Sequence, residues 1–378
     1  MRRRDFIAGI VGSTIISPLV GYAQSLDRTS QLERLGNPGK TSYPNAEQTF
    51  ARNVWCLKAF GDRIYIGIGN SENFGPAPNA GPADIWHFDP ATSRLVRDWS
   101  APDEQVEVFR VIEGQLVVPG NDPMESWEFG NFYRLEQDGW KKYRTLPNGL
   151  HNFDMIKFGG VLYAALGTEA GAVVAASEDD GMTWRVQPLV PVARGFYSRA
   201  HSLFVLSGRL YASATGWMGW QIFGLTRDGF SLIHSSNFFP GIGASRPVFV
   251  SAFTSFREQG VYIARERQAQ GHPQPVGLYV AANPEAIRTI ELMPDVQPRD
   301  IAMSSKRLFV LVTRQTTAGY DNHVFETSDL AEWREAFHFR TATFARAFEL
   351  SGDDFYFGLG TNHNNVHPET GELLRLRG

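Results

Sequence analysis

The sequence predicts an all-β protein built from short antiparallel strands, and three observations support this fold class. Aromatic residues make up 13% of the 378 residues and glycine occurs 37 times, whereas only 20% of the residues are charged. An apolar strand that follows a turn recurs along the whole chain, and further short apolar runs follow each copy. Aromatic residues favour strands and glycine favours tight turns, while long helices usually contain more Ala, Glu and Lys.

The recurring strand defines an internal repeat. Its central residue is, in chain order, Tyr65, Val117, Tyr163, Tyr211, Tyr262, Phe309 and Tyr356. Successive central residues are separated by 52, 46, 48, 51, 47 and 47 positions. A third strand follows in each unit, and a turn and a fourth strand follow it in the first six units. Four short strands in about 45–50 residues are typical of a β-propeller blade. We therefore expect a seven-bladed β-propeller over residues 51–378.

The seventh unit ends at its third strand, Leu373–Leu376, close to Gly378. The segment 24–50 precedes the first unit, and we expect its part from Gln24 to Ser42 to provide the missing outer strand. Such pairing closes the ring without a disulfide, which a chain with Cys56 as its single cysteine cannot form internally.

Residues 1–23 have the pattern of an export signal. Three arginines precede a short apolar stretch, Ile7 to Val20, and Gly21-Tyr22-Ala23 provides a small-x-small cleavage site. The stretch is too short, and too interrupted, to remain as a membrane anchor. Arg3-Arg4-Asp5-Phe6-Ile7 resembles a twin-arginine signal, and a general secretory signal is the alternative. Either signal predicts a periplasmic or secreted protein that does not stay with the membrane.

The composition also excludes several classes of partner. The net charge of −4, without a basic run after the first residues, argues against nucleic-acid binding. We find no phosphate-binding loop, dinucleotide fingerprint, nucleophile elbow or EF-hand pattern, so we expect no cofactor. His363 and His367 have metal-compatible spacing only on a helix, and they lie in a loop-like stretch, so we expect no metal there. We also expect a monomer.

The stretch Ser177-Glu-Asp-Asp-Gly-Met-Thr-Trp184 falls at the turn between the third and fourth strands of the third unit. Its aspartate can accept hydrogen bonds from turn amides, its glycine can take a positive φ, and its tryptophan can pack between blades. The stretch resembles the Asp box of sialidase-like (BNR-repeat) propellers at every signature position. These positions are Ser177, Asp179, Gly181, Thr183 and Trp184.

In that family the Asp box is a structural turn, so the resemblance implies a fold and no particular activity. Decayed versions are present at 136–140, 226–230 and 327–333. The chain has no Arg-Ile-Pro motif and seven units rather than six, which departs from true sialidases. Photosystem-assembly propellers also have seven blades, but they carry Asp boxes in most of them.

The candidate site is expected on the face opposite the Asp-box turns, where the entry links of the units meet the loops between second and third strands. His201, Arg299 and Arg346 each lie ten residues before a central residue, which places these side chains near the channel mouth. Tyr197 and Arg199 share one side of an extended segment with His201, by the period of two. The catalytic candidates are His151, His201, Tyr197, Arg199, Arg299 and Arg346. The substrate-binding candidates are Arg52, Asn70, Trp127, Arg246, Tyr320 and His363.

Cationic and aromatic side chains at one mouth favour an acidic oligosaccharide or polysaccharide as the partner. In architecture, export and site chemistry the chain resembles seven-bladed propellers that cleave uronate-containing glycans, although no family motif matches by residue. The resemblance implies a polysaccharide lyase that acts by β-elimination. An arginine (Arg199, Arg299 or Arg346) would neutralise the uronate carboxylate, and His151 or His201 would remove the adjacent proton. Tyr197 or the second histidine would protonate the leaving oxygen.

Two alternatives remain open. A non-enzymatic glycan-binding or assembly-scaffold propeller would use the same cationic mouth to dock an acidic partner. A glycoside hydrolase would use two carboxylates, such as Glu72 with Asp122 or Asp154.

Overall fold

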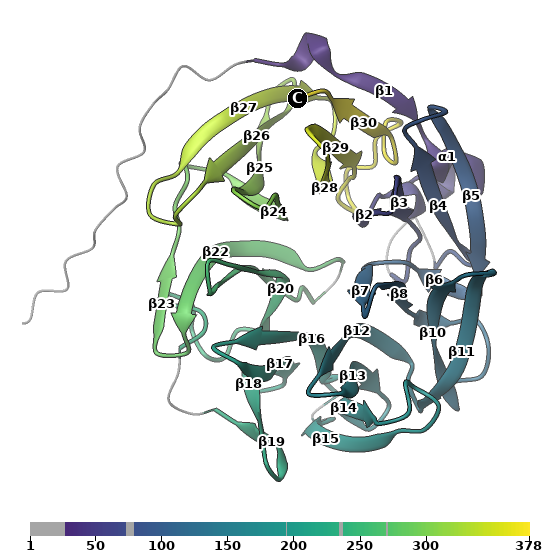
Figure 1. Cartoon of the computed structure of the whole chain (residues 1–378), viewed down its shortest axis with the longest axis vertical. Helices are drawn as coiled ribbons and strands as arrows, with labels where there is room; N and C mark the ends of the chain where they lie inside the picture. The colour runs from purple at the N-terminus through teal and green to yellow at the C-terminus, as the bar shows by residue number, and fades with distance from the viewer. Residues whose placement is uncertain (1–26, 73–78, 194, 234–236, 270) are drawn as a thin grey trace, which may run out of the picture.

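Seven four-stranded antiparallel blades form a closed ring, which confirms the predicted all-β seven-bladed propeller (Figure 1). The computed structural model describes residues 27–72, 79–193, 195–233, 237–269 and 271–378. The expected export signal, residues 1–23, lies outside these ranges. Within them, no helix is long and apolar enough to cross a membrane.

The strands of each blade follow one another in the chain. Blade 1 contains β2 (Cys56–Phe60), β3 (Arg63–Gly67), β4 (Ala83–Asp89) and β5 (Arg94–Ala101). Blade 2 contains β7 (Arg110–Ile112), β8 (Gln115–Pro119), β10 (Phe129–Glu136) and β11 (Gly139–Pro147). Blade 3 contains β12 (His151–Phe158), β13 (Val161–Thr168), β14 (Gly171–Ser177) and β15 (Arg185–Pro191). Blade 4 contains β16 (Arg199–Leu206), β17 (Arg209–Gly216), β18 (Gly219–Thr226) and β19 (Gly229–Leu232).

The remaining blades have the same order. Blade 5 contains β20 (Val248–Phe256), β21 (Gln259–Glu266), β22 (Gln274–Asn283) and β23 (Ala286–Thr289). Blade 6 contains β24 (Gln297–Met303), β25 (Leu308–Thr316), β26 (Gly319–Thr327) and β27 (Arg334–Thr341). Blade 7 contains β28 (Ala345–Ser351), β29 (Asp354–Leu359), β30 (Leu373–Leu376) and β1 (Glu33–Gly36). The helices η1 (Thr29–Gln31), α1 (Pro38–Ser42) and η2 (Ala46–Arg52) all precede blade 1.

Two short strands extend blade 3 on its inner side. β9 (Asn121–Pro123) pairs with β12, and β6 (Asp103–Gln105) pairs with β9, so this sheet has six strands. Both strands belong to the links around blade 2. They bring Asn121 and Asp122 to the channel beside His151.

The apolar core lies between neighbouring blades. Tyr65 of β3 and Leu116 and Val118 of β8 belong to one buried cluster between blades 1 and 2. Tyr262 of β21 and Tyr356 of β29, which are also central residues of the repeat, are almost fully buried. The repeated aromatic strand is therefore the second strand of each blade, packed face to face against its neighbours.

The chain closes the ring by pairing its two ends. β1 pairs antiparallel with β30, with Glu33 opposite Arg375, and it forms the outer strand of blade 7. Figure 1 shows β1, in purple, beside β30, in yellow. Glu33 also accepts hydrogen bonds from Arg375 and from Arg377, whose Nε lies 2.6 Å away.

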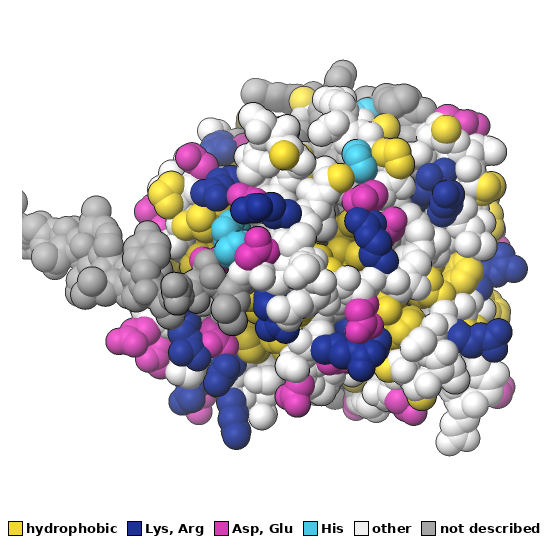
Figure 2. All heavy atoms as spheres, turned by 90° about the horizontal axis from the view of Figure 1, so that it is seen from above, with side chains coloured by type: hydrophobic (Ala, Val, Ile, Leu, Met, Phe, Trp, Pro, Cys, Tyr) yellow, Lys and Arg dark blue, Asp and Glu magenta, His cyan; other side chains and the backbone are white. Residues whose placement is uncertain are grey.

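The rim of the ring carries both signs of charge. Figure 2 shows basic and acidic side chains interspersed on this side of the molecule, without a large surface of one sign. This side of the rim therefore offers no broad electrostatic surface for a polyanion, and the central cavity remains the candidate site.

Candidate functional site

A cavity of about 1270 Å³ occupies the centre of the ring. It is lined by the inner strands, by entry links and second-to-third-strand loops at one end, and by first-to-second-strand turns such as Gly159–Gly160 at the other end. Four of the six catalytic candidates line it. These are His151, Tyr197, Arg199 and His201.

His151 belongs to a hydrogen-bonded chain at this end of the cavity. Its Nε2 lies 3.0 Å from Nη2 of Arg199, and its Nδ1 lies 2.5 Å from Oδ1 of Asp122. Because an arginine can only donate, Nε2 must be the acceptor, and the ring proton is on Nδ1, toward Asp122 and Asn121. Burial lowers the pKa of His151 well below its usual value, and Arg199 and Arg267 lower it further. His151 is therefore a neutral imidazole with both nitrogens engaged by protein groups.

His201 has a different environment. Its ring stacks on Phe249, with centroids 3.9 Å apart, and lies 5.1 Å from Phe153 on β12. Nε2 lies 2.9 Å from Oγ1 of Thr215, and no hydrogen bond to Nδ1 is found among the described residues. Burial lowers the pKa of His201 well below its usual value, with further lowering by Arg267 and Arg199. When Nε2–H donates to Thr215, Nδ1 presents a free lone pair.

Two arginines and two aromatic residues frame the same end of the cavity. Arg267 donates to the backbone carbonyl of Tyr197, and its guanidinium lies 4.8 Å from the ring centre of Phe196. Burial lowers the pKa of Arg267 to about 10, and the nearby Arg199 lowers it as well. Tyr197 is 59% exposed at this position. The two guanidinium groups form a positive site next to both histidines.

Carboxylates face these cations. His272 Nδ1 lies 3.1 Å from Oε1 of Glu72, and His272 Nε2 lies 3.6 Å from Oε1 of Glu107. Burial alone would raise the pKa of Glu107, but the interaction with His272 and nearby arginines bring it below its usual value. Burial raises the pKa of Asp122 to about 7. The cavity is therefore not uniformly basic.

Several cavity residues were not singled out from the sequence. These are Trp55, Glu107, Arg265 and Arg267. The signal for the two arginines was present in the run Ile263-Ala-Arg-Glu-Arg267, because alternate residues after an apolar strand point to one side. Glu107 lies in the irregular link before blade 2, between β6 and β7. The sequence there has no strand-like alternation from which the direction of its side chain could be predicted.

Two catalytic candidates are buried in the wall outside the cavity lining. Arg299 donates to Thr313 Oγ1 at 2.8 Å and lies 3.9 Å from the ring centre of Phe344. Burial lowers its pKa to about 9. Arg346 donates to Asn53 Oδ1 at 3.1 Å and lies 4.3 Å from the ring centre of Trp55, which lines the cavity. Both arginines thus support the wall rather than face the cavity.

The substrate-binding candidates do not line the cavity either. Arg52 donates to the backbone carbonyls of residues 43–45, and Arg246 forms an ion pair with Glu266. Tyr320 is buried and packs edge-on against Phe344, whereas Trp127 is 53% exposed. Asn70 is buried and accepts a hydrogen bond from the amide of Glu72. His363 packs edge-on against Phe50.

The Asp-box-like turn is tightly hydrogen-bonded. Asp179 accepts from the amide of Thr183 at 2.8 Å and from its hydroxyl at 2.6 Å. Ser177 Oγ accepts from the amide of Gly181, which has a φ of +92°. Trp184 packs edge-on against Phe132 of blade 2. None of these residues lines the cavity, so the contacts within this turn are those of a structural element.

The sequence matches no protein-family model and no curated protein, whereas solved structures share its fold. It is similar to a chain of hydrazine synthase from Kuenenia stuttgartiensis, with 10% identity, a TM-score of 0.54 and coverage of 89% of this chain and 98% of that one. A chain of the mitotic checkpoint complex has 10% identity and a TM-score of 0.54, with 100% and 99% covered. A Mycobacterium tuberculosis puromycin-hydrolyzing peptidase has 13% identity and a TM-score of 0.50, with 82% and 49% covered. At such identities these likenesses show the propeller fold alone.

Proposed function

We propose that the protein is a polysaccharide lyase that cleaves a uronate-containing glycan in the central cavity by β-elimination. The observation that carries this proposal is the environment of His201. It is a neutral imidazole that lines the cavity, with Nε2 held by Thr215 and two arginines nearby. A base that removes a proton next to a carboxylate needs this combination.

The reaction would proceed around the two guanidinium groups. Arg199 and Arg267 would neutralise the uronate carboxylate and so acidify the proton on the adjacent carbon. His201 Nδ1 would take this proton, a carbon–carbon double bond would form, and the glycosidic carbon–oxygen bond at the β position would break. The Tyr197 hydroxyl would protonate the leaving oxygen. His151, held between Arg199 and Asp122, would fix the position of Arg199.

The cavity walls are compatible with a sugar chain. Aromatic side chains at the same end provide stacking surfaces, while Asn121 and Glu72 provide hydrogen-bonding groups for hydroxyls. The N-terminal sequence pattern supports a periplasmic or secreted location, where extracellular glycans are encountered.

The test is an absorbance measurement. The protein is incubated with a panel of uronate polysaccharides, and the ultraviolet absorbance of an unsaturated uronate product is followed. We expect a signal that His201→Ala abolishes and that His367→Ala, outside the cavity lining, leaves unchanged. A signal that survives in His201→Ala would contradict the assignment of the base. No signal with any substrate, together with tight and salt-sensitive binding of one of them, would favour a glycan-binding propeller instead.

A glycoside hydrolase is the second candidate, and the raised pKa of the Asp122 carboxyl favours it. A carboxyl group with a pKa of about 7 can act as a general acid near neutral pH, and Glu72 lines the same cavity. This reaction would release reducing ends without the absorbance of an unsaturated product, so measuring both signals separates the two enzymes.

A further inference from the structure

Two histidines and one glutamate meet on blade 6, away from the central cavity. His323 on β26 and His338 on β27 are directly opposite each other in the antiparallel pair. The register shifts between Val324 and Phe325, so that Phe325 is opposite Glu335. This bulge places Glu335 on the same side of the strand as His338, although the two are three positions apart and a regular strand would put them on opposite sides.

The three side chains converge on one point. His323 Nδ1 lies 2.7 Å from Glu335 Oε1, and His338 Nδ1 lies 3.1 Å from the same oxygen. One ligand atom from each of the three residues lies within 4.8 Å of the others. The side chain of His323 is 8% exposed, while those of Glu335 and His338 are 20% and 17% exposed. The cluster is thus mostly shielded but open on one side to solvent.

We propose that His323, Glu335 and His338 form a binding site for a divalent transition-metal ion, with Zn²⁺ as the expected occupant. Two imidazoles and one carboxylate are a donor set that zinc favours, with a water molecule completing the tetrahedron. Ligands about 2.0–2.1 Å from zinc lie roughly 3.3 Å apart. The present separations of 2.7 and 3.1 Å therefore have to widen by only a few tenths of an ångström. Imidazole ligands also disfavour Mg²⁺ and Ca²⁺, which prefer oxygen.

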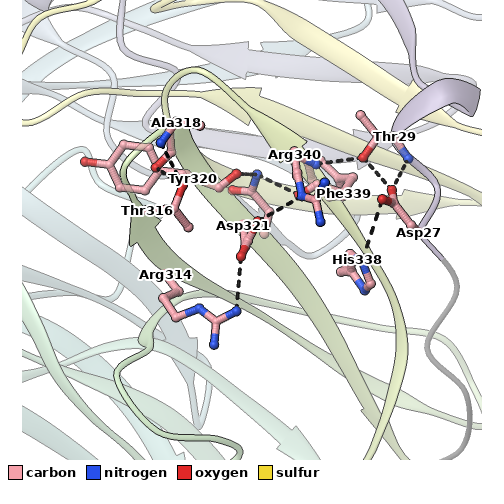
Figure 3. Close-up of polar contacts among 12 residues, drawn as sticks. Asp27, Thr29, Arg314, Thr316, Ala318, Tyr320, Asp321, His338, Phe339 and Arg340 are labelled. Atoms are coloured by element: carbon pink, nitrogen blue, oxygen red, sulfur yellow. Dashed lines mark hydrogen bonds and ion pairs between the residues drawn. The ribbon is translucent and has the colours of Figure 1, made fainter.

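An outer carboxylate supports the site from the N-terminal segment. Asp27 Oδ2 lies 4.0 Å from Nε2 of His338 (Figure 3). The other ring nitrogen, Nδ1, is the one that faces Glu335. A metal-bound histidine usually directs its other N–H to a carboxylate, which orients the ring. Asp27 is itself fixed by Thr29, whose amide donates to Oδ1 at 2.9 Å. Metal binding would therefore also attach the N-terminal segment more firmly to blade 6.

The test is metal titration of the full chain without a polyhistidine tag. Metal is removed with a chelator, the chelator is removed, and Zn²⁺ is added in a calorimeter. We expect one ion per chain with a Kd in the micromolar range or below, and a raised thermal unfolding midpoint. Co²⁺ in place of Zn²⁺ is expected to give the visible absorption bands of a four- or five-coordinate ion.

Two substitutions test whether Zn²⁺ binds at His323, Glu335 and His338 rather than elsewhere on the chain. Glu335→Gln keeps an oxygen acceptor for both histidines but removes the charged ligand, and His338→Gln removes one imidazole. We expect each to weaken Zn²⁺ binding at least about 100-fold, and Asp27→Asn to weaken it less. The control is Asp98→Asn on blade 1, where a carboxylate pairs with His87 at 3.1 Å and no third ligand is found within the described part of the chain. Absence of binding at millimolar Zn²⁺, or binding that Glu335→Gln and His338→Gln leave unchanged, would overturn the proposal.

Discussion

His151 and His201 line the same cavity, but their hydrogen bonds suit them to different tasks. His151 is engaged at both ring nitrogens, by Arg199 and by Asp122, so it can orient the arginine but has no free lone pair. His201 is held at Nε2 only, by Thr215, within the described residues. Because Arg199 and His151 are hydrogen-bonded to each other, a substitution at either residue is expected to disturb the position of the other.

Asp179 provides a residue-scale prediction about pH. Hydrogen bonds from the Thr183 hydroxyl and amide lower the pKa of its carboxyl to about 2 from 3.8. The folded form therefore binds the proton less readily than the unfolded form. The resulting stabilisation is complete above pH 3.8 and is lost as the pH falls toward 2. In Asp179→Asn, we expect a lower urea midpoint at pH 7 and a smaller further loss between pH 4 and 2.5 than in the wild type.

The matched control is Asp228, at the corresponding position of the blade 4 turn. No hydrogen bond to its carboxylate is found among the described residues, although its amide donates to Thr226 Oγ1 at 3.3 Å. Asp228→Asn should therefore leave the urea midpoint nearly unchanged at both pH values. Equal effects of the two substitutions would show that the hydrogen bonds of Asp179 do not stabilise the turn.

Sequence reasoning at this scale could place some side chains at the cavity and not others. The alternation of Tyr197, Arg199 and His201 predicted one shared side; all three line the cavity, but so do Phe196 and Ser202, and the strand bulges between Ala200 and Ser202. Sequence reasoning could not place Arg299 and Arg346, although they have the same offset from the central residue as His201. Their long side chains extend back to bond Thr313 and Asn53 inside the wall, and such a rotamer choice depends on neighbours that are distant in sequence.

At the scale of the strands, carboxylates join the inner strands of neighbouring blades. Asp154 on β12 accepts from the amide of Met155 and from that of Leu203 on β16. Asp300 on β24 repeats this pattern with its own neighbour and with Phe348 on β28. Each carboxylate therefore satisfies a backbone amide of the next blade where no ladder partner is available.

Asp154 additionally forms a two-point ion pair with Arg110 of blade 2, at 2.6 and 2.8 Å. Asp154→Ala would leave this arginine and the Leu203 amide without their partner, and we expect a loss of about 3 kcal/mol in the free energy of unfolding. Arg110→Met should cost less, because Asp154 keeps its two backbone donors. Urea unfolding measures the loss of stability in both variants. A larger loss in Arg110→Met than in Asp154→Ala would contradict this account.

The strand pattern itself was largely readable from the sequence, because the aromatic central residues recur at a nearly constant interval. The two short strands β6 and β9 were not expected. Their residues, such as Asp103, Gln105 and Asn121, are polar and carry no alternation. β9 pairs with β12 and β6 pairs with β9, and the carboxylate of Asp103 accepts a hydrogen bond from the buried hydroxyl of Tyr133.

At the scale of the whole molecule, the ring depends on the pairing of β1 with β30. Without β1, blade 7 would have three strands and an exposed edge at Leu374 and its neighbours, which are buried in the complete ring. The sequence indicated this closure because the seventh unit lacks a fourth strand.

Removal of β1 tests the importance of the closure. A chain that begins at Asn37 is compared with one that begins at Asp27. We expect the shorter chain to unfold at a temperature lower by on the order of 5 °C or more, and to self-associate through the exposed edge. Differential scanning calorimetry and light scattering measure the two effects. An unchanged midpoint in a monomeric shorter chain would show that β1 is dispensable.

The pairing of β1 with β30 also has a consequence for the order of events during synthesis. β1 leaves the ribosome before blades 1–6, but β30, the strand that it pairs with, is made only after all six of them. Until β30 has been made, blades 1–6 can only form an open arc, and β1 remains unpaired at one end of it. If two such arcs meet before closing, β1 of one copy fits the β30 edge of the other as well as its own. Crowded production should therefore yield exchanged dimers, and dilution during folding should yield rings.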